Sequence, residues 1–113
     1  MSDRLAVVKG TLDALVLKAL AWGPMHGFEV AAWLEARSNG ALALDDSGLY
    51  QALYRLEGRG LVTAEWGVTE NNRRARYYSV TAGGRAHLKR ETVTWVRYAS
   101  TVTGILTEPH GAS

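Results

Sequence analysis

Apolar residues recur at helical spacing through the first half of the chain. They stand three or four positions apart in residues 11–21, again in residues 27–37, and again after Asp45, which predicts three amphipathic helices. Gly23-Pro24 is expected to end the first helix, because proline disfavours helical backbone in the residue before it. Asp45 is expected to cap the third helix, which Gly58 and Gly60 weaken and close.

The pattern changes after the third predicted helix. Residues 61–66 and 76–81 alternate roughly like strands, and the second run is rich in strand-forming residues. Residues 67–74 between them are polar, so we expect a hairpin with a long basic tip. Thr81 is then expected to cap a last helix that runs from Ala82 to about Leu106.

One face of this last helix carries apolar residues at the spacing of a coiled-coil seam. A helix of ~25 residues at ~1.5 Å per residue is about 40 Å long, which is more than a domain of this size can cover with its own helices. We therefore expect a second copy of the chain to cover the face. The predicted dimer interface consists of Leu88, Trp95, Ala99, Val102 and Leu106.

Together these elements predict a mainly α fold with a β-hairpin, of the winged helix-turn-helix type. We expect the winged helix-turn-helix to occupy residues 1–81, the dimerisation helix residues 82–107 and a flexible tail residues 108–113. In such folds the third helix enters the major groove of double-stranded DNA. The hairpin is the wing beside it.

The candidate DNA contacts lie on the third helix and on the hairpin. The polar side of the helix faces away from its apolar stripe, and glutamine and arginine there can read base edges. Arginines in a hairpin suit phosphates and a narrow minor groove. A plain solvated helix face remains the alternative. The predicted DNA-binding residues are Ser47, Tyr50, Gln51, Tyr54, Arg55, Arg73, Arg74 and Arg76.

Charge is distributed unevenly along the chain, although the formal net charge is only +2. Residues 1–49 hold four basic and six acidic residues, whereas residues 50–97 hold nine basic and four acidic ones. A basic half on a near-neutral chain points to a polyanionic partner.

Several classes of function are excluded or disfavoured. The chain has no cysteine, which excludes disulfides, thiol catalysis and cysteine-based metal sites. The three histidines do not stand at metal-binding spacing, and no glycine-rich phosphate loop follows a strand, so we expect no enzyme, no cofactor and no metal. The longest apolar-rich stretch, residues 11–23, falls short of the ~20 residues of a membrane span, and the start does not read as a signal peptide. A cytoplasmic protein without a membrane partner is expected.

Four motifs in this order resemble the PadR family of transcriptional regulators. They are Lys9–Asp13 with Gly23–Val30, Leu49–Leu61 followed by Trp66, Arg76–Thr81, and Gly84-Arg85. A single helix after the hairpin resembles the smaller members of that family. The chain departs from the family at Phe28, where tyrosine is common, at Gln51, where proline is common, and at Gly83-Gly84, which should loosen the last helix.

The resemblance implies a homodimer that binds operator DNA through its winged helix and dimerises through its last helix. Many members repress genes and are released by a small molecule. In drug-sensing members a tryptophan of the last helix stacks on planar aromatic ligands, and Trp95 resembles it. An ordinary aromatic packed at the dimer seam is the alternative for Trp95.

A different class of function also fits the pattern. A winged-helix module that docks on a protein and binds nucleic acid only weakly could use Phe28, Trp33 and Trp66 as its docking patch. The three arginines of the hairpin argue against it. Otherwise Trp22, Trp33 and Trp66 are expected to pack in or against the core.

Overall fold

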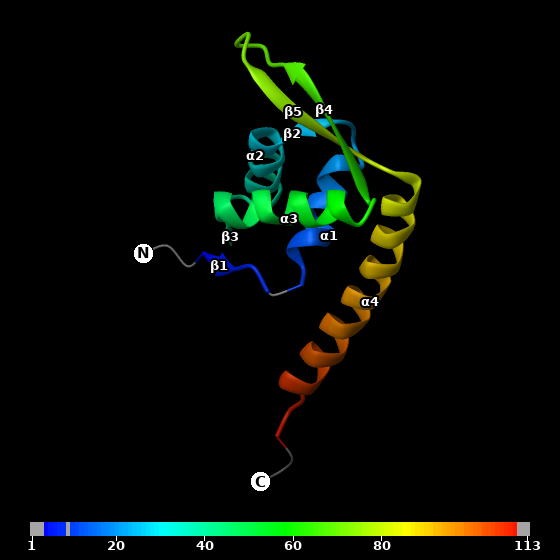
Figure 1. The fold of residues 1–113 in the computed structure, drawn as a ribbon. Helices are drawn as coiled ribbons and strands as arrows, with labels where there is room; N and C mark the ends of the chain where they lie inside the picture. The colour runs from blue at the N-terminus through cyan, green and yellow to red at the C-terminus, as the bar shows by residue number, and fades with distance from the viewer. Residues whose placement is uncertain (1–3, 9, 111–113) are drawn as a thin grey trace.

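The computed structural model describes residues 4–8 and 10–110, so Lys9 of the first motif and part of the predicted tail lie outside the described residues. Three helices precede a hairpin, and a long helix follows it (Figure 1). The elements in chain order are β1 (Leu5–Ala6), α1 (Leu12–Leu20), β2 (Met25–His26), α2 (Gly27–Arg37), β3 (Leu42–Ala43), α3 (Asp46–Gly58), β4 (Val62–Val68), β5 (Arg74–Val80) and α4 (Ala82–Leu106). The mainly α winged-helix architecture predicted from the sequence is confirmed.

The core lies where the apolar stripes of α1, α2 and α3 meet. Leu17, Val30 and Leu53 are among its fully buried side chains, and Val62 and Tyr78 of the hairpin close it from one side. The start of α3 is fixed locally. The Asp45 carboxylate accepts from the Gly48 amide at 3.1 Å, as a capping residue should. The apolar stripes thus place α3 on the core with its other side facing solvent.

The hairpin has longer strands and a shorter turn than its sequence predicted. Strands β4 and β5 pair antiparallel from Val62↔Val80 to Val68↔Arg74. The turn closes because the Thr69 amide donates to the Arg73 carbonyl at 2.8 Å and Asn72 adopts a φ of 60°, which asparagine tolerates. The expected tip of residues 67–74 is therefore wrong, and Arg74 lies in a strand.

Three two-residue strands were not predicted. Strand β2 pairs with the free edge of β5, so that the sheet order is β2-β5-β4. Strand β1 pairs with β3 in parallel, and Arg4 donates to Glu35 and to the Gly40 carbonyl, both at 3.0 Å. Runs this short carry no alternation that a sequence could display.

Helix α4 starts at a close contact with the end of the hairpin. The Thr81 hydroxyl accepts from the Gly84 amide at 2.9 Å, and the Thr81 amide donates to the Leu61 carbonyl at 3.0 Å. Gly84 is buried. A Cβ there would lie 2.8 Å from Val80 Cγ2 and would overlap the Leu61 carbonyl oxygen. The expectation that Gly83-Gly84 loosens this helix is therefore wrong at Gly84, because the missing side chain lets the helix and the strand meet.

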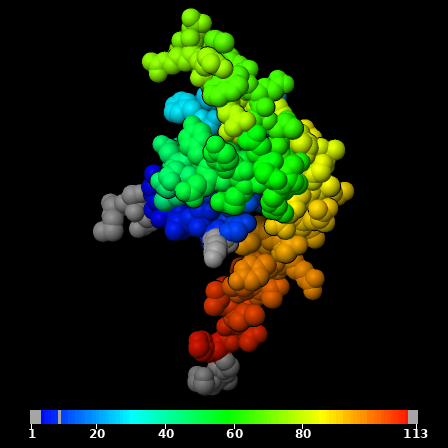
Figure 2. Space-filling model, viewed as in Figure 1, coloured from blue at the N-terminus to red at the C-terminus, as the bar shows by residue number. Residues whose placement is uncertain are grey.

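The far part of α4 extends away from the rest of the molecule (Figures 1 and 2). The molecule measures 65 × 37 × 20 Å, and its radius of gyration of 16.7 Å exceeds the ~13 Å of a compact chain of this length. Beyond Thr92 the helix keeps large apolar side chains in solvent, including Ile105 and Leu106, which are 70% and 77% exposed. Among the described residues, little covers this part of α4 beyond the groove that Trp95 and Tyr98 share with α1.

Candidate nucleic-acid interface

The outer side of α3 is polar and exposed. Its inner stripe of Leu49, Leu53 and Leu56 is buried in the core, which fixes the rotation of the helix. The predicted contact residues Ser47, Tyr50, Gln51, Tyr54 and Arg55 all lie on exposed positions of this helix. Tyr54 is 71% exposed, and Tyr50 is 49% exposed with its ring against Gly27 of α2. Hydroxyl, amide and guanidinium groups are thus brought together on one helix.

Arg55 is held by a partner outside α3. Its Nη2 donates to Asp13 Oδ1 of α1 at 2.7 Å, and the side chains are 53% and 22% exposed respectively. The hydrogen bond to this carboxylate raises the pKa of Arg55. The Arg55 guanidinium is therefore anchored to α1, while about half of the side chain stays exposed.

The three arginines predicted on the wing have different surroundings. Arg73 is exposed at the turn, and the Arg74 guanidinium lies 4.7 Å from the centre of the exposed Trp66 ring. Arg76 is half-buried and donates to Glu57 of α3 at 2.9 Å, and this hydrogen bond raises the pKa of Arg76. Arg76 thus ties the hairpin to α3, while Arg73 and Arg74 lie free to meet an anion.

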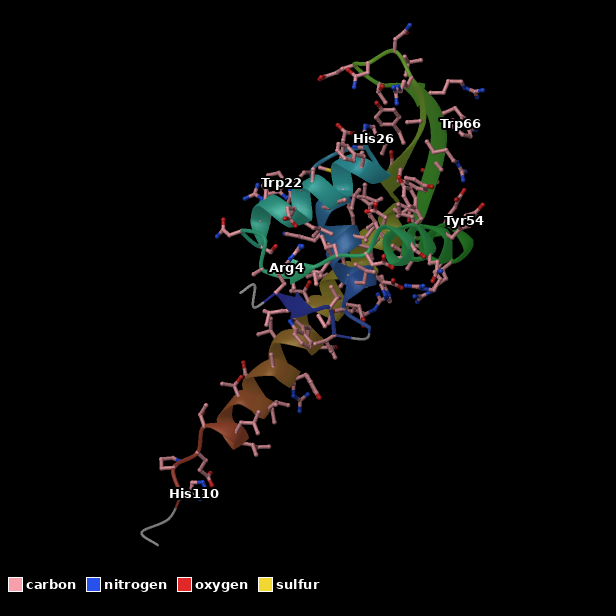
Figure 3. The ribbon with its side chains drawn as sticks, turned by 90° about the vertical axis from the view of Figure 1, so that its left-hand side faces the viewer. Arg4, Trp22, His26, Tyr54, Trp66 and His110 are labelled. Carbon is pink, nitrogen blue, oxygen red and sulfur yellow. The ribbon has the colours of Figure 1, made fainter. Side chains whose placement is uncertain are left out.

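A hollow of about 690 Å³ lies between the hairpin, the start of α2 and α3. Figure 3 shows Trp66 on the hairpin and Tyr54 on α3 on the same side of the molecule. Phe28, 74% exposed at the start of α2, also lines it. The hollow is lined by three arginines and no carboxylate, so its lining favours an anion, although the charge of Arg76 is partly balanced by Glu57.

Sequence reasoning grouped Phe28 and Trp66 only in the alternative docking patch, and it placed two of the tryptophans too deep. Trp22 and Trp66 are 67% and 61% exposed, so the expectation of core packing is wrong for both. An arginine covers each ring instead, with Arg37 lying 5.8 Å from the Trp22 ring centre. A cation over an aromatic face is favourable at a surface, and the hydrophobic pattern does not report it.

A second concave surface lies between α1 and α4. This groove of about 810 Å³ is lined by Leu15 of α1 and by Leu88, Trp95 and Tyr98 of α4. The Trp95 and Tyr98 rings stack with centres 6.0 Å apart. Basic side chains border it as well, namely Lys18, Arg85 and Lys89. The groove thus combines apolar walls with a basic border.

The residues of the predicted dimer seam do not share one environment. Leu88 packs against the core of its own chain, and Ala99 and Val102 are half-buried. Trp95 and Leu106 are 42% and 77% exposed. Within the described residues, the exposed part of the seam therefore begins near Trp95.

Some kinds of site have no counterpart in the part of the chain that the structure describes. Residues 4–8 and 10–110 contain no group of three or more His, Asp or Glu side chains that could hold a metal ion. Among the same residues, no helix is both long and apolar enough to cross a membrane.

The chain belongs to the PadR-like family of transcriptional regulators, whose model matches residues 16–90. The matched segment contains most of α1, all of α2, α3 and the hairpin, and the start of α4. The family consists of transcriptional regulators and not of enzymes. One long helix follows the hairpin, as in the smaller members that the sequence resembles.

Solved structures of such regulators share this fold. A transcriptional regulator from Clostridium thermocellum is similar with a TM-score of 0.77 at 24% identity, over 85% of this chain and 90% of its own. A PadR-like regulator from Bacillus cereus is similar with a TM-score of 0.76 at 20% identity, over 90% of this chain and 97% of its own. PadR of Bacillus subtilis, solved in complex with operator DNA, gives 0.66 at 18% identity, over 74% of this chain and 47% of its own length.

Proposed function

We propose that this protein is a sequence-specific DNA-binding repressor that acts in the cytoplasm as a homodimer and is released by a planar aromatic ligand. The observation that carries the DNA-binding part is the exposed polar face of α3 beside a hairpin with three arginines. A related regulator of the same fold has been solved with operator DNA, which supports the same use of the surface here.

In this proposal α3 enters the major groove and the hairpin follows the adjacent backbone. Gln51 is suited to adenine, since its amide can donate and accept at once. Arg73 and Arg74 contact phosphates, which fix the position of the protein without reading the sequence. Ser47, Tyr50 and Tyr54 supply further contacts, and Arg76 acts mainly by holding the hairpin against α3.

Fluorescence anisotropy tests the DNA-binding part. Binding of the duplex upstream of the protein's own gene is compared with a random duplex of equal length at several salt concentrations. We expect the upstream duplex to bind at least ~10³-fold more tightly, with a steep salt dependence. Absence of binding even at low salt would overturn the proposal and favour the protein-docking module with its exposed Phe28 and Trp66.

Two variants separate the roles of helix and hairpin. Arg73→Ala should weaken binding of both duplexes similarly and lower the salt slope by about 0.9. Gln51→Ala should weaken binding of the upstream duplex selectively, because it removes a base contact. Equal losses on both duplexes for both variants would contradict this assignment.

The homodimer rests on the exposed apolar part of α4. Trp95, Ala99, Val102 and Leu106 form the proposed seam, and Leu88 contributes where the groove begins. Leu106→Glu should shift size-exclusion elution toward the monomer at micromolar concentration. Thr101→Glu adds the same charge at an exposed position on the other side of the helix and should elute as the unaltered protein does. A monomeric unaltered protein would contradict the proposal.

The ligand is proposed to stack on Trp95 in the groove between α1 and α4. Its apolar walls favour an aromatic molecule, and Lys18, Arg85 and Lys89 favour one that carries negative charge. The probe is 1-anilinonaphthalene-8-sulfonate, whose fluorescence rises in apolar surroundings. We expect it to quench tryptophan fluorescence and to bind Trp95→Ala at least about tenfold more weakly. Equal binding to both proteins would assign Trp95 to dimer packing alone.

A further inference from the structure

The nine residues of α1 present two opposite surfaces to the rest of the molecule. Thr11, Ala14, Leu15 and Lys18 line the groove toward α4. At about 100° per residue, Asp13 lies roughly 150° around the helix from the middle of that group. Its carboxylate meets Arg55 of α3 at 2.7 Å. Asp13 is therefore separate from the groove and from the α4 seam, and a change there should leave both intact.

This ion pair changes what Arg55 can offer to DNA. A guanidinium has five N–H donors in a rigid planar fork, and the Asp13 carboxylate accepts from Nη2. The charge of Arg55 is largely balanced by its partner, so the attraction to phosphates at a distance is reduced. The remaining donors keep a fixed direction, because the side chain is anchored at its far end.

Arg73 provides the contrast. It is exposed at the hairpin turn, and no described carboxylate forms an ion pair with it. Its full charge can follow a phosphate in many side-chain conformations. The two arginines thus differ in what they can recognise. Arg55 can offer donors in a fixed direction, whereas Arg73 can offer an unbalanced positive charge.

We propose that Asp13 is a positioning residue for DNA recognition: it holds the Arg55 guanidinium so that Arg55 discriminates between base sequences instead of adding to non-specific phosphate binding. The inference rests on the proposed DNA-binding function. It assigns to α1 a role in sequence preference although α1 lies behind α3.

The test measures anisotropy with two duplexes over a range of salt. One is the tightest-binding duplex selected from a randomised library, and the other is a random duplex of equal length. Asp13→Asn keeps the size of the side chain and removes its charge. We expect it to bind the random duplex roughly two- to fivefold more tightly. Its salt slope should grow by about 0.9, because Arg55 can now reach a phosphate. The ratio between selected and random duplex should fall at least about fivefold.

Four comparison variants keep the interpretation specific. Arg55→Ala should weaken the selected duplex and leave the salt slope unchanged, whereas Arg73→Ala should lower the slope. Asp13→Asn in the Arg55→Ala background should have no further effect on slope or ratio, since the carboxylate acts through Arg55. Asp13→Glu keeps the carboxylate and should therefore preserve much of the ratio between binding of the selected and the random duplex. If Asp13 had a merely structural role, Asp13→Asn would lower binding of both duplexes together and would not steepen the salt dependence of binding.

The failures are distinguishable. If Arg55→Ala lowers the salt slope as Arg73→Ala does, Arg55 is a phosphate contact and the inference is overturned while the proposed function stands. The same holds if Asp13→Asn leaves slope and ratio unchanged. If the unaltered protein binds no selected duplex better than random DNA, the proposed function fails and the inference fails with it. Unchanged size-exclusion elution of each variant shows that the oligomeric state was preserved.

Discussion

The two adjacent glycines at the start of α4 should respond in opposite directions to the same change. At Gly84 a Cβ would lie 2.8 Å from Val80 Cγ2 and 3.1 Å from the Leu61 carbonyl carbon. The Leu61 carbonyl cannot move alone, because it accepts from the Thr81 amide. At Gly83 the nearest neighbour of a Cβ would be Thr81 Oγ1 at 3.7 Å, an ordinary contact.

The size of each effect follows from these distances. Forcing a methyl group into a packed site costs about 1–3 kcal/mol. Weakening the cap that Thr81 gives to the Gly84 amide adds roughly 1 kcal/mol. Alanine regains about 0.5–1 kcal/mol over glycine in a helix. We therefore expect Gly84→Ala to lower the free energy of unfolding by about 1–3 kcal/mol and Gly83→Ala to raise it by about 0.5–1 kcal/mol.

Thermal unfolding followed by circular dichroism measures the difference. For a chain of this length 1 kcal/mol corresponds to roughly 3–6 °C in Tm, so the two variants should differ by at least about 5 °C. All proteins are compared at one concentration, because the stability of a dimer depends on it. Equal midpoints for both variants, or a Gly84→Ala protein as stable as the unaltered one, would refute the close-packing argument.

Two further predictions concern the core and its edge. Leu53→Ala should lower the free energy of unfolding by roughly 2–5 kcal/mol, since Leu53 is fully buried, whereas the neighbouring Tyr54→Ala should change it by less than ~0.5 kcal/mol and weaken DNA binding instead. Urea unfolding and anisotropy separate these effects. Burial raises the pKa of Tyr78. The neutral phenol is thus favoured in the folded state, and its contribution is complete below about pH 10, the ordinary value, and is lost as the pH rises through the raised pKa. Urea midpoints should fall in strongly alkaline solution, and Tyr78→Phe should reduce that fall.

Much of the fold could be predicted because several independent local features of the sequence indicate the same helix bounds. The apolar stripe of α3, the Asp45 cap and the closing glycines agree, and the helix forms where all three place it. The same holds for α4, whose start at Thr81 is fixed by a local hydrogen bond. Such features involve residues close in the sequence, so a single sequence contains them in full.

The rest depends on contacts between distant residues. Nothing in the sequence alone links Arg55 to Asp13 or Arg76 to Glu57, although these pairs decide which arginines are free to meet DNA. Trp66 reads as a core residue until the Arg74 guanidinium over its ring is known. Leu88 fits the coiled-coil spacing, yet it packs on its own core as well. Periodicity identifies an apolar face and does not say which neighbour covers it.

The rigid start of α4 has a consequence for how a dimer would be regulated. Gly84 and Thr81 couple the helix tightly to the hairpin, and the hairpin is tied to α3 through Arg76 and Glu57. In the proposed dimer joined from Trp95 to Leu106, the segment of α4 from Ala82 to Trp95 acts as a lever arm of roughly 20 Å. A rotation of about 10° at the joint would displace the far end of this arm, and the α3 that is coupled to it, by roughly 3.5 Å. Two half-sites lie one helical turn apart, ~34 Å along the duplex, so such a displacement at both ends is enough to spoil simultaneous engagement of both grooves.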